Sequence, residues 1–105
     1  DLKIRNETET DSKYRDSLAN LRAQINVVDD QLIDLLAKRM KVADQIAARK
    51  KEQNVAVLQT RRWNEILGNL VLEGEQKGLS EEFVLRMFKA IHQESINHQE
   101  KIING

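Results

Sequence analysis

Apolar residues recur at alternating steps of three and four along the first half of the chain, the pattern of one face of an α-helix. The pattern begins at Leu18, and no glycine or proline interrupts it before about Gln53. It predicts a helix of roughly 35 residues, about 50 Å long at 1.5 Å per residue. We call this face the apolar stripe; its members are Leu18, Leu21, Ile25, Val28, Leu32, Leu35, Val42 and Ile46.

Two shorter helices follow, at about residues 60–73 and 81–102, so the fold class is all-α. Gly74 and Gly78 bracket the turn between them, and Ser80 is placed to cap the third helix. The predicted inward residues are Trp63, Ile66, Leu67, Leu70 and Val71 in the second helix, and Val84, Met87, Phe88 and Ile91 in the third.

Residues 1–17 differ from the rest, because they hold nine charges and only three sizeable apolar side chains. Such a segment cannot bury a face. We therefore predict a charged linker or lead-in over 1–17, poorly ordered, and a helical domain over 18–105. The chain does not begin with methionine, which would suit a piece of a longer protein.

The long helix is out of proportion to the chain. A compact domain of this size has a radius of gyration of only ~13 Å, so one copy would struggle to cover so long a rod. The apolar stripe is therefore expected to pair with a second copy, which predicts a homodimer.

Composition narrows the chemistry. The 105 residues carry 17 Lys+Arg and 17 Asp+Glu, which argues against nucleic-acid binding. Cysteine is absent and histidine occurs only at His92 and His98, both expected on the surface, so no metal site is predicted. No apolar run reaches transmembrane length and no signal peptide opens the chain, so we expect a cytoplasmic protein without membrane contact.

Polar residues interrupt two apolar faces. Arg39 takes a position in the apolar stripe, and Lys50, eleven residues on, points within about 20° of it. Ser95 and Gln99 likewise continue the apolar face of the third helix. Residues 38–62 hold eight basic and two acidic residues, which focuses positive charge there. These features predict an inward-facing site for a small polyanion, since guanidinium groups pair with carboxylates through two parallel hydrogen bonds.

Two segments carry a family resemblance. The chain contains LANLRAQINVVDDQLIDLLAKRMKVADQIAARK and LRMFKAIHQESINHQ, and residues 18–103 resemble the all-helical chorismate mutases. The resemblance implies three-helix chains in an intertwined homodimer with shared active sites, each built from both subunits. It also implies the Claisen rearrangement of chorismate to prephenate in aromatic amino-acid biosynthesis, without a cofactor. The joint spacing of six residues is specific: Arg22, Arg39, Lys50, Arg62, Ser95 and Gln99.

The resemblance also implies residue roles. Arg39 would bind one substrate carboxylate, with Arg62 in support, and Arg22 would reach the partner chain's site to bind the other. Lys50 and Gln99 would flank the ether oxygen, while Ser95 would bond near the ring or a carboxylate.

This sequence departs from the family at two positions, where acidic residues are common. Gln59 can still hydrogen-bond the substrate, but Trp63 cannot accept a hydrogen bond from the ring hydroxyl. Trp63 is expected to pack, and the contact to the hydroxyl is left open.

Two other functions remain open. An isochorismate-pyruvate lyase would use the same cationic pocket on a related dianion. A non-catalytic regulatory and dimerisation module would bind chorismate or prephenate without turnover. The charged residues 1–17 would suit a linker to a fused shikimate-pathway enzyme.

Overall fold

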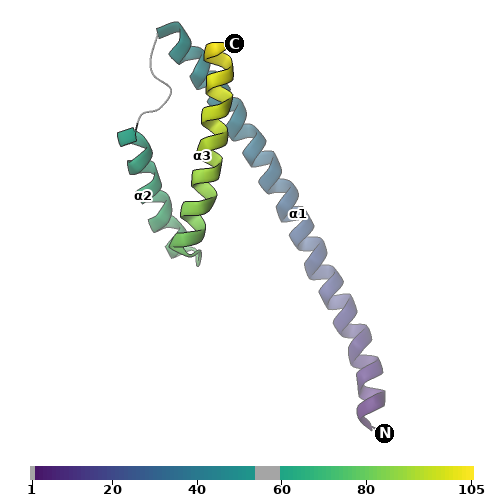
Figure 1. Ribbon diagram of the computed structural model, residues 1–105. Helices are drawn as coiled ribbons and strands as arrows, with labels where there is room; N and C mark the ends of the chain where they lie inside the picture. Colours follow the sequence, from purple (N-terminus) through teal and green to yellow (C-terminus); the bar gives the residue numbers. More distant parts are fainter. Residues whose placement is uncertain (1, 54–59) are drawn as a thin grey trace. The chain divides into compact units, whose positions relative to one another are not determined.

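The computed structural model describes the backbone of residues 2–53 and 60–105, and the side chains of residues 11–53 and 62–105. Three helices form in these ranges: α1 (Leu2–Gln53), α2 (Thr60–Gln76) and α3 (Glu81–Asn104) (Figure 1). No strand occurs within the described backbone. The predicted all-α class, with one long and two shorter helices, is confirmed.

The first helix starts earlier than the periodicity predicts. Its backbone is helical from Leu2, whereas the apolar pattern begins only at Leu18. Residues 2–17 contain no glycine or proline, so a helix can continue through them without burying a face. Residues 11–17 are exposed, so the missing apolar pattern there reflects exposure and not an absence of helix. That residues 1–17 act as a linker stays a prediction.

The turn between α2 and α3 corrects a second prediction. Gly74 lies inside α2 and is buried against α3. A Cβ at this position would come within 2.6 Å of Val84 Cγ2 on α3, so α2 and α3 approach closely here. Only Gly78, with a φ of 85°, takes the left-handed conformation that ends the helix. Hydrogen bonds from Leu79 N to Gly74 O (2.8 Å) and Gly78 N to Glu75 O (3.2 Å) complete a Schellman motif.

The predicted cap of the third helix is confirmed. The Ser80 hydroxyl accepts a hydrogen bond of 3.2 Å from the backbone N–H of Phe83. Glu81 and Glu82 follow in the first turn, where negative charge complements the helix dipole.

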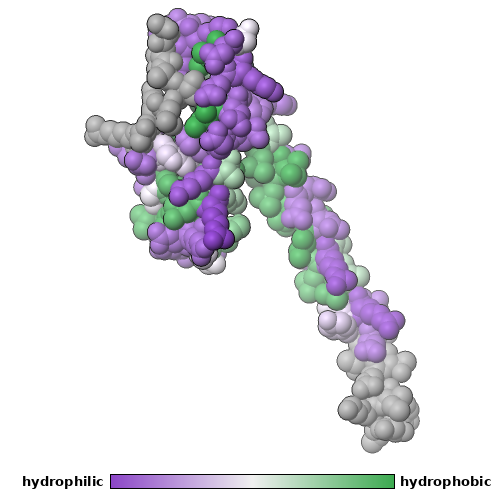
Figure 2. Space-filling view, in the orientation of Figure 1, coloured by the Kyte–Doolittle hydropathy of each residue, from purple (hydrophilic) through white to green (hydrophobic). Residues whose placement is uncertain are grey.

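The chain divides into two units, Asp1–Leu35 and Leu36–Gly105. The first is a length of α1 alone, and over its described side chains, from residue 11 on, apolar ones lie on one side of the helix with hydrophilic ones opposite (Figure 2). The members of the apolar stripe from Leu21 to Leu35 are largely exposed, by 50% to 63%, while Leu18 is half-buried.

The second unit joins the end of α1 to α2 and α3. Its buried apolar residues are Ala43 and Ala47 on α1 and Val84 on α3. The two alanines are one turn apart and small, so they let a neighbouring helix approach closely. Asp44 bonds His98 Nδ1 (3.0 Å), and Lys51 Nζ donates to the Ile102 carbonyl (3.1 Å), which ties α1 to α3.

The described helices include none that combines the length and the apolar character needed to cross a membrane.

Candidate active site

A cavity of about 170 Å³ opens among the three helices of the second unit. Three of its lining side chains are cationic and, among the described residues, none that lines it is acidic. It is therefore suited to an anion. The lining residues are Arg39, Ile46 and Lys50 from α1, Arg62, Trp63 and Ile66 from α2, and His92 and Gln99 from α3.

Arg39 is held from α3. Its Nη1 donates a hydrogen bond to Ser95 Oγ, and Ser95 is buried, with 4% of its surface exposed. The Ser95 hydroxyl lies 3.0 Å from the Ile91 carbonyl four residues earlier, so it can donate there while accepting from Arg39. Burial lowers the pKa of Arg39 below its ordinary value, yet a guanidinium stays charged at neutral pH. The result is a cation with a fixed orientation at the cavity wall.

Lys50 contacts Gln99 further along the interface between α1 and α3. Lys50 Nζ donates a hydrogen bond of 3.2 Å to Gln99 Oε1, and Gln99 is only 9% exposed. Burial lowers the pKa of the Lys50 ammonium below its ordinary 10.5. With its oxygen engaged, the Gln99 amide offers N–H groups, which can only donate. A cation and a neutral donor thus lie side by side.

Helix geometry explains why these residues converge. Arg39 and Lys50 lie three turns apart on one side of α1, and Ser95 and Gln99 lie one turn apart on α3. The bonds Arg39–Ser95 and Lys50–Gln99 advance together along both helices, so this part of α1 and α3 run in the same direction. Polar residues on one helix therefore face polar residues on the other.

His92 was predicted to lie on the surface, and that prediction is wrong. The residue is half-buried and lines the cavity, and its ring stacks on Trp63 with centroids 3.8 Å apart and planes 6° from parallel. A signal was available, because His92 precedes Gln99 by seven residues, two helical turns, and so shares its face. His98 is also half-buried, against Asp44.

The predicted site residues fall into three groups. Four line the cavity: Arg39, Lys50, Arg62 and Gln99. Ser95 contacts Arg39 and is not among the lining residues. Arg22 is exposed on α1 in the first unit, and Gln59 lies outside the described residues. The roles assigned to all seven stay predictions.

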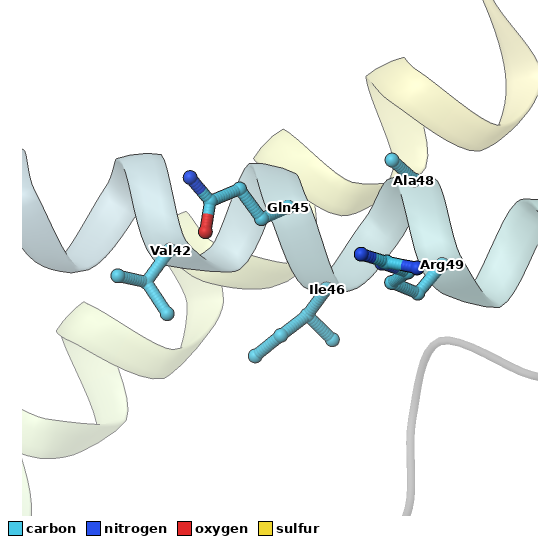
Figure 3. Close-up of a pocket in the computed structure, with 5 residues that line it drawn as sticks. All are labelled: Val42, Gln45, Ile46, Ala48 and Arg49. Atoms are coloured by element: carbon cyan, nitrogen blue, oxygen red, sulfur yellow. The ribbon is translucent and has the colours of Figure 1, made fainter.

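A second hollow, of about 380 Å³, lies on α1 alone. Figure 3 shows the five side chains that line it: Val42, Gln45, Ile46, Ala48 and Arg49. Val42 and Ile46 are each 45% exposed although they belong to the apolar stripe. This surface has the character of a contact face and carries a single charge.

Comparison with known proteins places the chain in a family. Residues 21–100 match the family described as chorismate mutase type II. Several similar proteins are bifunctional chorismate mutase/prephenate dehydratases. That of Buchnera aphidicola subsp. Baizongia pistaciae is 34% identical over 89 residues, covering 85% of this chain and 24% of the relative. That of subsp. Acyrthosiphon pisum is 32% identical over 87 residues, covering 83% and 23%.

A more distant relative has the same description. The bifunctional enzyme of Enterobacter agglomerans is 28% identical over 86 residues, covering 82% of this chain and 22% of its own. The chain thus spans about a quarter of the length of the curated relatives it matches. The family match covers most of the chain, and it confirms the resemblance carried by the motifs around Arg39 and Gln99: the chain belongs to the type II chorismate mutases.

Proposed function

We propose that this chain catalyses the rearrangement of chorismate to prephenate, a step of aromatic amino-acid biosynthesis. Membership of the type II family supports chorismate mutase function. The observation that carries the proposal is the convergence of Arg39, Lys50 and Gln99 on one cavity. Chorismate is a dicarboxylate whose ether bond breaks in the reaction, so it needs both cations and a donor to a developing oxyanion.

The protein contributes to this reaction mainly by positioning the substrate and by placing charged groups around it. It is unimolecular, so no nucleophile or proton carrier is required. Arg39 binds one carboxylate with Arg62 in support, since two parallel N–H donors match two oxygens. Ser95 holds Arg39 in place, and Gln59 adds a hydrogen bond to the substrate. These contacts fold the substrate into its reactive shape.

Lys50 and Gln99 then act on the bond that breaks. As the C–O bond lengthens, negative charge grows on the ether oxygen between them. A cation and an N–H donor at that oxygen stabilise the transition state more than the ground state. Because the two side chains are already bonded to each other, little reorganisation accompanies the reaction.

A second copy of the chain completes the proposal. The apolar stripe is exposed from Leu21 to Leu35 in the first unit, and Val42 and Ile46 are exposed in the second. Apolar faces of this extent on a helix are normally covered. In a homodimer they would pair, and Arg22 of the partner subunit would supply the cation for the second carboxylate.

Fusion to another shikimate-pathway enzyme, as in the relatives' names, is part of this proposal. A cytoplasmic location remains a prediction.

The decisive test is product identification. Purified protein is incubated separately with chorismate and with isochorismate, and the products are identified by mass spectrometry and NMR. Prephenate from chorismate is the expected result. Pyruvate released from isochorismate would instead indicate a lyase. Prephenate binding in calorimetry without turnover by the folded protein would indicate a binding module. Lys89→Ala, on an exposed face of α3 outside the cavity, is the control for charge removal.

A further inference from the structure

His92 has a feature that the proposed mechanism does not use. Its Nε2 atom is buried and has no hydrogen-bond partner within the described part of the chain. A buried polar atom left unpaired costs free energy, and such atoms are uncommon in folded proteins. The side chain that carries this atom is one of those that line the cationic cavity.

We propose that His92 contacts the substrate, with Nε2 hydrogen-bonded to the ring hydroxyl of chorismate and with Trp63 holding the imidazole in place. This inference rests on the proposed function and extends it to the ring hydroxyl, the fourth polar group of the substrate after the two carboxylates and the ether oxygen. It also answers the question left open at Trp63, whose indole cannot accept a hydrogen bond from that hydroxyl.

Stacking gives the imidazole a defined plane. The rings of Trp63 and His92 are 3.8 Å apart at their centroids and nearly parallel, which joins α2 to α3 across the cavity wall. A stacked ring of this kind is restricted in rotation about its side-chain bonds. The nitrogen atoms are therefore presented in fixed directions.

The charge around His92 sets its chemical form. The pKa of His92 is lowered from its ordinary 6.5, first by burial and then by the positive charges of Arg39 and Lys50. The acidic groups Asp44 and Glu94 contact His98 instead. At neutral pH the ring is therefore neutral, with one nitrogen that donates and one that accepts.

A neutral imidazole matches the one substrate group that the cations do not serve. The carboxylates are anionic and suit arginine, and the ether oxygen gains negative charge beside Lys50 and Gln99. The hydroxyl is neutral and can both donate and accept. A neutral imidazole can complement it in either direction, whereas a fourth cation beside Arg39, Lys50 and Arg62 would be repelled by them.

The experiment compares chorismate with an analogue in which hydrogen replaces the ring hydroxyl. Both compounds are tested for turnover and for calorimetric affinity, with the wild type, His92→Phe and His92→Gln. Phenylalanine keeps the stacked ring but removes both nitrogens, while glutamine restores a polar group. The wild type is expected to prefer chorismate roughly tenfold, the worth of one hydrogen bond. His92→Phe should reduce that preference to near one, and His92→Gln should retain part of it.

Two results would overturn the proposal. A preference for chorismate that is unchanged in His92→Phe would show that another group holds the hydroxyl. Equal losses with both compounds in both variants would assign His92 a purely structural role, and circular dichroism and melting curves would check folding in parallel. Failure of the proposed function is distinguishable, because affinity would still report the hydroxyl preference in a wild type that binds chorismate without converting it.

Discussion

Lys50 Nζ donates a hydrogen bond of 3.2 Å to Gln99 Oε1, which joins residues 49 positions apart in the sequence at the wall of one cavity. The bond keeps a positive charge and a neutral amide together where the proposed mechanism needs both. It also couples the end of α1 to the last third of α3.

Replacing Lys50 with alanine is expected to lower kcat by at least about a hundredfold, the usual effect of losing one preorganised donor to a developing oxyanion. The fold should survive, since Lys50 is only half-buried. Steady-state kinetics on chorismate, with circular dichroism of the same samples, measures the effect. Near-normal turnover by folded Lys50→Ala protein would reject the role, and Lys89→Ala should behave as wild type.

Activity should be lost at a lower alkaline pH than the ordinary pKa of a lysine side chain would predict. Burial lowers the pKa of Lys50 below 10.5, and the mechanism needs the ammonium, so kcat/KM should fall through a midpoint below that value. The bound dianion favours the charged form, so the limb in kcat should lie at higher pH than the limb in kcat/KM. Lys50→Arg should move both limbs upward. A pH profile with the same alkaline midpoint in that variant would contradict the assignment.

Mixing two inactive variants tests the shared site. Arg22→Ala and Arg39→Ala chains should each be nearly inactive, but a heterodimer would keep one complete site. Random exchange should therefore restore about a quarter of the wild-type activity, because half of the dimers are mixed and each has one intact site. No recovery after proven subunit exchange would argue against a site built from two chains.

Light scattering should give a mass near twice 12.2 kDa.

The contact of α2 with α3 predicts opposite effects at two glycines. Gly74→Ala would push a methyl group to 2.6 Å from Val84 Cγ2 and should destabilise the fold by about 1–3 kcal/mol. Gly68→Ala meets nothing within 4 Å and should stabilise α2 by up to about 1 kcal/mol. Urea denaturation at fixed protein concentration compares the two. Equal effects at both positions would mean that α2 and α3 do not approach as closely as described.

Much of this arrangement could be predicted from hydrophobic periodicity. Arg39 and Gln99 were found because each replaces an apolar residue on a helical face, and Ser80 was found because caps have a local chemical signature. His92 was missed because a histidine on a mixed face reads equally well as exposed. Its environment depends on Trp63, which lies on another helix. The early start of α1 was missed because periodicity reports burial, and a helix can continue without it.

Gly74 illustrates a further limit of sequence reasoning. Near the end of a helix, glycine reads as a turn residue. Its actual place depends on the Val84 side chain ten positions later, and no local pattern contains that information. Close approach between helices is visible only once their packing is known.

The Ser95 hydroxyl has one proton, and the Ile91 carbonyl lies where it can take it. The hydroxyl oxygen therefore accepts from Arg39 through a lone pair whose direction is set by the backbone of α3. The orientation of the guanidinium thus depends on the position of α3 along its own axis. Substitutions far along α3 that slide it against α1 should consequently appear as catalytic defects, even though no residue at the cavity has changed.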